Sequence, residues 1–230
     1  MDGLTSLAVA SAAFVGTHFL LSHPLRAPLV AALKPAGFMI VYALVAFATL
    51  GWMAHAYKAA PAGDLLWPVG DGIWIVVTIV MLLASLLLMG SLIGNPALPG
   101  PVMAKAPEPR GAFTITRHPM MWAFALWALC HIAIMPNAAN IIVSVAILIL
   151  ALVGSKLQDA KKEQLQPDMW RDWEAKTSWL PFGAIASGKV RLGGFRPHDW
   201  AGAIVVWLGA TWAHIPSVGV PAGIWRWISL

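Results

Sequence analysis

The chain has 230 residues, of which 59% are hydrophobic and 11% charged, with a mean hydropathy of +0.74. This composition excludes a soluble globular domain, which carries about 25% charged residues, and it excludes intrinsic disorder, which needs low hydrophobicity. A single cysteine, Cys130, excludes an intrachain disulfide and a metal cluster built of cysteines alone. The net charge of +5 lies between apolar runs, which indicates orientation in a membrane and not nucleic-acid binding.

Long runs without Asp, Glu, Lys or Arg predict membrane-spanning helices, since about 20 apolar residues cross the hydrocarbon core. The longest run, between Arg117 and Lys156, has room for two spans, and the turn dipeptide Pro136-Asn137 divides it. In chain order we expect six helices, near residues 4–24, 36–57, 73–95, 118–135, 138–160 and 200–217. The predicted fold is an all-α bundle of six transmembrane helices, forming a single domain over residues 1–230.

Positive charge is distributed unevenly between the two ends of these spans. The connections 25–35, 96–117 and 161–199, together with Lys156, hold 13 of the 15 Lys and Arg residues. The positive-inside rule therefore predicts that these connections are cytoplasmic and that both termini lie in the periplasm of a bacterial inner membrane. No Lys or Arg precedes the first span, so we expect it to be retained and not cleaved as a signal peptide.

Two segments on the predicted cytoplasmic side have distinct patterns. Asn95–Pro101 contains three prolines and is expected to be extended or ordered against the bundle, not helical. Residues 161–182 are expected to form an interfacial amphipathic helix. The apolar face of this helix consists of Leu165, Met169, Trp170 and Trp173. It has two interpretations, a rest on the membrane surface or a lid over Arg117 and His118.

Histidines at membrane depth are functional candidates, because a polar side chain in lipid needs a partner; the simpler interpretation is a hydrogen bond to a neighbouring helix. His131 and His214 lie toward the periplasmic ends of the fourth and sixth expected spans. The depth of His18 depends on the first helix: if it ends at Pro24, His18 lies nearer the cytoplasm, and if it continues toward Val30, His18 reaches the depth of His131. We expect no acidic residue inside any span, which argues against a di-iron carboxylate site. Imidazoles without carboxylates favour haem over a hard cation, and also suit copper or a nonpolar substrate.

Three motifs carry a resemblance to a known family. They are Val15-Gly16-Thr17-His18 followed by Pro24-Leu25-Arg26, then Thr116-Arg117-His118-Pro119 running on to His131, and finally Trp170 and Trp173 followed by Thr177-Ser178-Trp179-Leu180-Pro181-Phe182. Together they resemble the NnrU family of bacterial inner-membrane proteins, over nearly the whole chain. That family takes its name from gene neighbourhoods concerned with nitrite and nitric oxide reduction, and it is homologous to the 15-cis-zeta-carotene isomerases.

The isomerases bind haem b between histidines of the first and fourth spans. The resemblance therefore implies His18 and His131 as axial iron ligands, with His214 as a reserve ligand. The isomerases also have a cysteine three residues before the second histidine. Here that position is Ala128, and Cys130 is adjacent to His131 instead, so the resemblance does not carry the ligand exchange of the isomerases to this chain.

A second resemblance uses the same Arg117-His118-Pro119 motif. With Gly111-Ala112-Phe113 before it and Glu163 after it, the motif looks like that of isoprenylcysteine membrane methyltransferases, in which a tail containing Glu closes over S-adenosylmethionine. This resemblance implies Arg117, His118 and Glu163 as catalytic candidates. The structural interpretation of the motif is that Arg117 contacts lipid phosphate, His118 forms a hydrogen bond across the loop, and Pro119 begins a helix.

Three functional hypotheses follow. The leading one is a haem b protein that meets a hydrophobic polyene or nitric oxide, linked to denitrification or to carotenoid isomerisation, with His118 as a further cofactor-binding candidate. The second is an S-adenosylmethionine-dependent methyltransferase, and the third is a non-catalytic assembly factor for nitric oxide reductase. In each case we expect a lipid environment and no nucleic acid. The GxxxG pair Gly90 and Gly94 has two interpretations, a homodimer contact or the general frequency of small residues in membrane helices.

Overall fold

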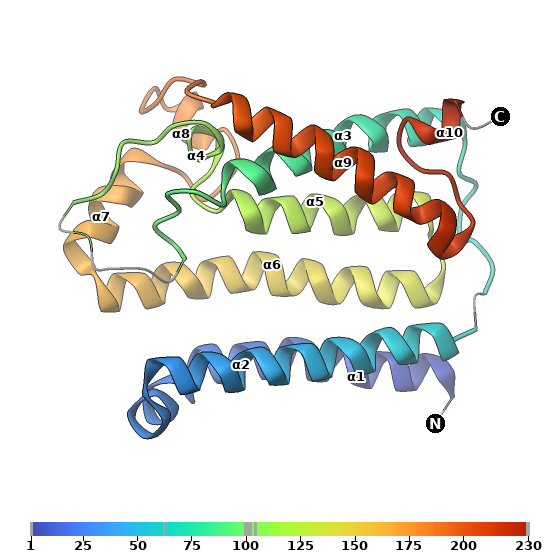
Figure 1. Cartoon of the computed structure of the whole chain (residues 1–230), viewed down its shortest axis with the longest axis horizontal. Coiled ribbons are helices and arrows are strands. Elements are labelled where there is room, and N and C mark those ends of the chain that lie inside the picture. Colours follow the sequence, from blue (N-terminus) through green and yellow to red (C-terminus); the bar gives the residue numbers. More distant parts are fainter. Residues whose placement is uncertain (1, 62, 99–102, 104, 229–230) are drawn as a thin grey trace. The chain divides into compact units, whose positions relative to one another are not determined.

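The structure is a computed structural model that describes all residues except 1, 62, 99–102, 104 and 229–230 (Figure 1). Its described part is helical and contains no β-strand, as the sequence predicts. The helices, in chain order, are α1 (Gly3–Ser22), α2 (Arg26–Ala59), α3 (Asp71–Gly90), α4 (Ala112–Ile115), α5 (Pro119–Ile134), α6 (Ala138–Leu165), α7 (Pro167–Lys176), α8 (Gly183–Ala186), α9 (Pro197–Val218) and α10 (Trp225–Ile228).

Each of the six expected spans corresponds to one helix. Five of them, α1, α2, α3, α6 and α9, are long and apolar enough to cross a membrane. The sixth, α5, is apolar but has only 16 residues, which at 1.5 Å per residue gives about 24 Å, less than the ~30 Å hydrocarbon core. The chain is a multi-pass helical membrane protein.

The chain divides into two compact units, each described here by itself. Unit 1 consists of Met1–Val69 and His131–Leu157, and unit 2 of Gly70–Cys130 and Gln158–Leu230. The division passes through α5 and α6, so each of these helices contributes one end to unit 1 and the other to unit 2.

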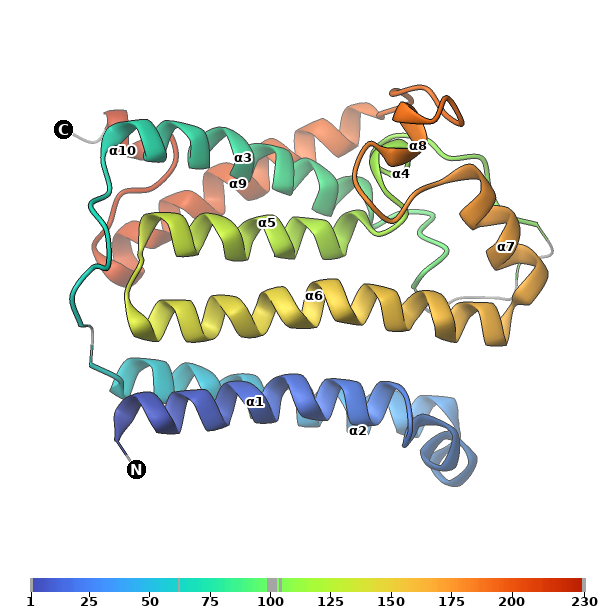
Figure 2. The same cartoon turned by 180° about the vertical axis from the view of Figure 1, so that it is seen from behind.

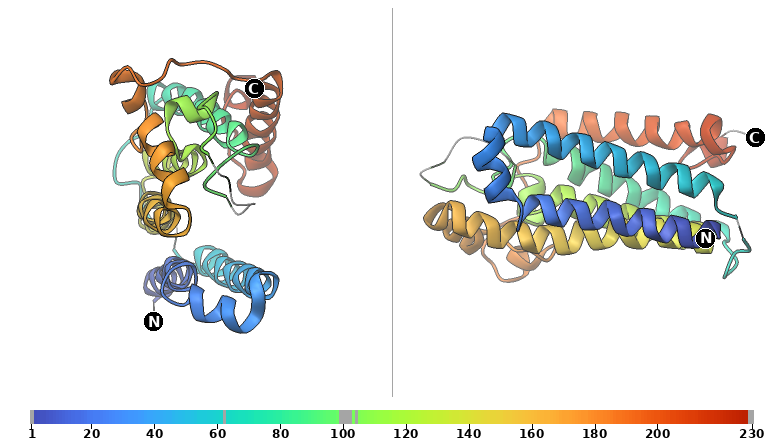
Figure 3. Two further views of the ribbon diagram at one scale, coloured as in Figure 1. Left: turned by 90° about the vertical axis from the view of Figure 1, so that its left-hand side faces the viewer. Right: turned by 90° about the horizontal axis from the view of Figure 1, so that it is seen from below.

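In unit 1, α1 and α2 lie side by side (Figures 2 and 3) and share a core with the first half of α6. Leu7 and Phe14 of α1, Met53 of α2 and Ala139 of α6 belong to this core. Asp2 begins α1 by accepting a hydrogen bond from the Thr5 backbone N–H at 2.7 Å, as an N-terminal cap.

The helix α2 is broken near its start. Lys34 has φ 62° and ψ 165°, and Pro35 follows it. The residue before a proline is driven out of the helical region by the proline ring, which explains why the break falls here. The short first part of α2 is therefore turned relative to the long part (Figure 3).

In unit 2, α3 and α9 run antiparallel and pack on each other (Figures 1 and 2). Their approach is close, since a Cβ on Gly202 would lie 2.8 Å from Met89 Cε. A hydrophobic core of this unit joins Ala84 and Leu87 of α3 to Ala112 of α4 and to Ala123 of α5. The short helices α4 and α8 and the helix α7 gather at the end where α3 stops and α9 starts (Figure 1).

The structure decides one open alternative about these elements and corrects three expectations. The helix α1 ends at Ser22 and does not continue toward Val30. The helix α6 continues past residue 160 to Leu165, and the separate amphipathic helix is only α7. Asp159, which falls within the expected span 138–160, lies inside this membrane-span helix, where no acidic residue was expected.

The glycine pair of the GxxxG motif does not lie on one helix. The helix α3 ends at Gly90, and Gly94 lies beyond it with a φ of +73°. Gly90 serves a contact within the chain, because a Cβ there would lie 2.9 Å from Ala112 Cβ. The motif therefore gives no helix face on which a homodimer could form.

Candidate functional site

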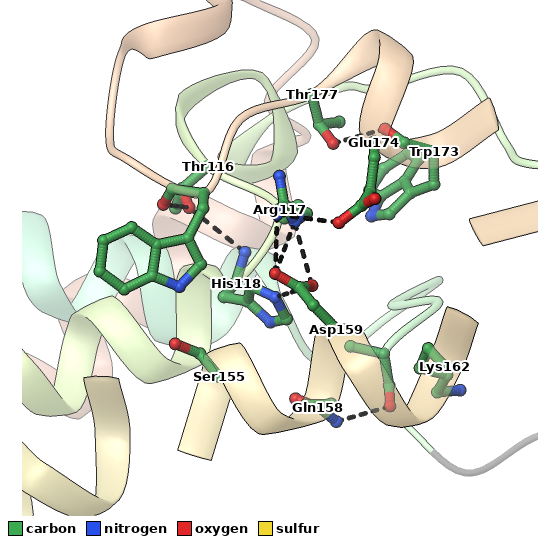
Figure 4. A network of polar contacts seen from close by, with 12 residues as sticks. Thr116, Arg117, His118, Ser155, Gln158, Asp159, Lys162, Trp173, Glu174 and Thr177 are labelled. Carbon is green, nitrogen blue, oxygen red and sulfur yellow. Dashed lines mark hydrogen bonds and ion pairs between the residues drawn. The ribbon is translucent and has the colours of Figure 1, made fainter. Parts of the chain in front are cut away.

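A network of buried ionic side chains lies in unit 2, at the junction of the Arg117-His118-Pro119 motif with the end of α6 (Figure 4). Asp159 is its centre: Oδ2 accepts a hydrogen bond from Arg117 Nη2 at 2.7 Å, and Oδ1 accepts one from His118 Nε2 at 2.6 Å. Arg117 Nη2 also pairs with Glu174 Oε1 at 3.0 Å. His118 is fully buried, and the Arg117 and Asp159 side chains are 11% and 10% exposed.

The segment after α7 holds the motif in place. The backbone N–H of Arg117 donates to the Ser178 carbonyl at 2.8 Å, and the Trp179 carbonyl accepts from both Thr116 Oγ1 and Trp122 Nε1. Pro119 is the first residue of α5, the position at which proline costs no hydrogen bond. The structure thus supports the structural interpretation of His118 and Pro119, whereas Arg117 binds two carboxylates of the chain.

The helix α7 packs its apolar face on protein. Met169, Trp170 and Trp173 are buried in a cluster with Phe113, and the Trp170 and His118 ring centroids are 6.2 Å apart. Leu165 belongs to α6 and is 52% exposed. The interpretation of this face as a rest on the membrane surface is therefore wrong, and α7 covers the network as a lid would.

The end of α6 also fixes the loop that follows α3. Lys162 Nζ donates to the carbonyls of Pro96 and Leu98 at 2.7 and 3.1 Å, and Gln158 Nε2 donates to the Ala97 carbonyl at 2.7 Å. The expected ordering of this loop is confirmed for residues 95–98, which are not helical. Its expected continuation to Pro101 lies outside the described residues.

Glu163, the carboxylate expected beside Arg117 and His118, is not brought to them. It is 50% exposed and lies 3.6 Å from Arg171. Asp159 and Glu174 take the place that the sequence interpretation gave to Glu163. A signal for Asp159 was present, since it lies inside the expected span 138–160 and one helical turn before Glu163, but the spans were treated as free of acidic residues.

In unit 1, His18 lies near the end of α1 in an aromatic setting. Its Nδ1–H donates to the Phe14 carbonyl at 2.7 Å. The ring is edge-on to Phe14 at 4.4 Å and to Tyr42 at 5.6 Å between centroids. The Nδ1 hydrogen bond leaves Nε2 as the ring nitrogen with a lone pair.

His131 lies near the end of unit 1 that is opposite to His18. Its carbonyl accepts from Asn140 Nδ2 at 2.8 Å, which places it beside the start of α6. Phe19, next to His18, lies beside Gly154, where a Cβ would be 3.6 Å from Phe19 Cε1. Asn140 and Gly154 are separated along α6 by about 21 Å at 1.5 Å per residue.

This separation bears on the expected ligand pair, which stays a prediction. Two imidazole nitrogens on one iron lie within a few ångströms of each other. His18 and His131 lie beside levels of α6 about 21 Å apart, which argues against both side chains holding one iron. The sequence interpretation made the pairing depend on α1 continuing past Pro24, and α1 ends before it.

The remaining candidates lie in unit 2. His214 is in α9, and its Nδ1–H donates to the Ala210 carbonyl at 2.8 Å. His118 uses Nε2 for Asp159, which leaves Nδ1, a buried atom with no hydrogen-bond partner among the described residues. Cys130 is a buried free cysteine. Among the described residues, no group of three or more His, Cys, Asp or Glu could hold a metal ion.

These features define a class: a multi-pass, all-helical membrane protein whose arginine–histidine–proline motif is held by a buried ionic network under a tryptophan-rich helix. The chain belongs to the NnrU family, since the model of that family, described as NnrU protein, matches residues 6–222. Neither a search of curated proteins nor a search of solved structures finds a match.

Proposed function

We propose that this NnrU-family protein binds haem b in unit 1, with His18 as the one protein residue that would hold the iron. The observation that carries the proposal is the 2.7 Å hydrogen bond from His18 Nδ1–H to the Phe14 carbonyl, together with the ring contacts of His18 to Phe14 and Tyr42. A metal-ligating histidine ordinarily donates its other ring N–H to a carbonyl or carboxylate, which fixes the tautomer and orients the free nitrogen. His214 makes a similar bond to the Ala210 carbonyl, so the aromatic contacts decide for His18, and His118 has its Nε2 committed to Asp159.

The surroundings of His18 support the same proposal. An apolar groove of about 540 Å³ runs between α1 and α6 of unit 1; its lining includes Val15 and Gly16, in the turn before His18, but not His18 itself. Phe14 and Tyr42 flank the imidazole. An apolar, aromatic setting of this kind suits a porphyrin face, and small residues such as Gly16 leave room for one.

Haem iron with one protein ligand keeps a coordination position for a small molecule. The resemblance to proteins of nitrite and nitric oxide metabolism makes nitric oxide the first molecule to test there, and a polyene the second. The chain's own residues would hold the porphyrin and fix the imidazole. Because Ala128 replaces the cysteine of the isomerases, an isomerase-type ligand exchange has no residue to carry it at that position.

The proposal is tested by the spectrum of the full-length protein purified in detergent from haem-supplemented cells. We expect near-stoichiometric haem b by pyridine haemochrome, a Soret band that His18→Ala removes, and a Soret band that His131→Ala retains. His55→Ala, at an exposed histidine of α2, is the matched control and should retain it. A colourless wild-type protein contradicts haem binding, and equal loss in the His18 and His131 variants contradicts the single-ligand site.

The two other hypotheses have less support. Methyl transfer required Glu163 beside Arg117 and His118, and Glu163 is exposed and paired with Arg171 instead. A purely structural role, as in an assembly factor for nitric oxide reductase, would account for the buried ionic network but not for the free nitrogen of His18 among aromatic rings.

A further inference from the structure

A pocket of about 300 Å³ lies in unit 2 beside the ionic network. It opens where α3 stops, at Gly90, and where α9 starts, next to Arg196 and Asp199. Both helices are apolar enough to span a membrane, so their shared end marks the level of the lipid headgroups.

Of the charged side chains around this pocket, the two carboxylates have cationic partners, whereas one arginine has no carboxylate partner among the described residues. Asp199 is bound by Arg196 at 3.0 Å and by the Arg196 backbone N–H at 2.9 Å. Glu108 is bound by Lys176 at 3.0 Å. The hydrogen bonds from Lys176 to Glu108 and then to Asp172 raise the pKa of the Lys176 ammonium, so that it stays charged. Arg110, which also lines the pocket, has no carboxylate partner among the described residues.

Buried nitrogen atoms beside the pocket lack hydrogen-bond partners. Trp173, 1% exposed, lines the pocket, and its Nε1–H has no acceptor among the described residues. Trp170 Nε1–H and His118 Nδ1 also lack partners among the described residues, but these two residues do not line the pocket. Buried polar groups are nearly always satisfied in native proteins, so the unpartnered N–H of Trp173 indicates a missing polar ligand at the pocket.

The backbone around the pocket is built for close approach. Gly111 has φ +57° and its N–H donates to the Gly193 carbonyl at 2.7 Å. Gly194, with φ +73°, leaves only 3.0 Å between a Cβ there and Arg110 Cβ. The two loops therefore touch through glycines, and this contact holds the start of the Arg110 side chain at the edge of the pocket.

We propose that this pocket binds the phosphodiester of an anionic phospholipid headgroup, with Arg110 as the main cationic contact. Among the described residues that line the pocket, the charge without an oppositely charged partner is that of Arg110, which is positive and selects an anion. Both carboxylates are already paired, so none remains for the ammonium of a zwitterionic headgroup. The position at the shared end of two spans favours a lipid over a dissolved phosphate ion, since the headgroup phosphates of the bilayer lie at this level.

The test uses the full-length protein in detergent, with thermal stability and retained lipid by native mass spectrometry as readouts. Phosphatidylglycerol should be retained at least fivefold more than phosphatidylethanolamine, and Arg110→Gln should abolish this preference. Arg191→Gln, an exposed arginine outside the pocket, is the matched control and should keep it. Trp173→Phe, which removes the N–H and keeps an aromatic ring, should lower retention.

Three outcomes would overturn the proposal. One is equal retention of phosphatidylglycerol by wild type and Arg110→Gln. Another is stabilisation by millimolar inorganic phosphate without any preference among lipids, which would assign the pocket to a dissolved anion. The third is stabilisation by S-adenosylhomocysteine that is lost in Arg110→Gln, which would return the site to the methyltransferase hypothesis. None of these results depends on whether haem binds in unit 1.

Discussion

At the scale of single residues, Asp159 is the centre of the buried ionic network of unit 2. It accepts hydrogen bonds from Arg117 and from His118, and both donors are largely removed from water. Removing one partner of a buried ionic pair leaves the other charge uncompensated, which costs far more than the pair itself contributes.

We therefore expect Asp159→Ala to lower the free energy of unfolding by about 3 kcal/mol, because it leaves Arg117 and His118 buried without an acceptor. Glu163→Ala, on the same helix but exposed, should change it by less than about 0.5 kcal/mol. Thermal unfolding of the two variants in detergent measures the difference. Equal melting temperatures would show that the network contributes no stability.

At the scale of elements, the break in α2 stores backbone strain in one residue. The φ of 62° and ψ of 165° at Lys34 lie in a region that only glycine occupies readily. The break separates a short helix from the long part of α2, which packs on α1 and carries Met53 and Ala56 of the unit 1 core.

Lys34→Gly is expected to raise the free energy of unfolding by about 1 kcal/mol, because glycine adopts this conformation without a Cβ clash. The adjacent change Leu33→Gly, in helical backbone, is expected to lower it by about the same amount. Melting temperatures in detergent should thus move in opposite directions. A loss of stability in both variants would contradict the strain assigned to Lys34.

At the scale of the whole molecule, charge-free runs were sufficient to predict the six long helices and the all-α class. The last turn of α6 was not predicted, because the span was expected to end at residue 160 although a helix can continue past the end of the apolar run. Asp159 lies within the expected span, but the spans were treated as free of acidic residues, so its role was missed. Spacing correctly placed Met169, Trp170 and Trp173 on one apolar face but wrongly included Leu165, which lies exposed on α6. Spacing also does not say what a face packs on, and here it is Phe113.

The histidines show a related limit. Sequence position gives the depth of a side chain along its own helix only after both helix ends are known. For His131 the turn at Pro136 fixed the end of its helix. For His18 the sequence allowed two alternative ends of the first helix, at Pro24 or toward Val30. The structure ends α1 at Ser22, and the expected pair is then separated along α6.

The sidedness of the protein remains a prediction from its charges. With 13 of 15 Lys and Arg in three connections, we expect alkaline phosphatase fused after the last residue to be active outside the inner membrane. A green fluorescent protein at the same place should be dark, while the same reporter inserted at exposed Ser187 should fluoresce. The reverse pattern would invert the proposed orientation of the whole bundle.

The contact between Asn140 and the end of α5 bears on how the chain enters a bilayer. Asn140 Nδ2 donates to the carbonyls of both His131 and Met135, and the Asn137 side chain accepts from the Asn140 backbone N–H. The His131 carbonyl in the last turn of α5 and the Met135 carbonyl just after it are thus bonded by the next helix. A helix of 16 residues is a weak insertion signal alone. With part of its polar end tied to α6, α5 can be carried in by the long, strongly apolar α6, and the two would leave the insertion machinery together as one hairpin.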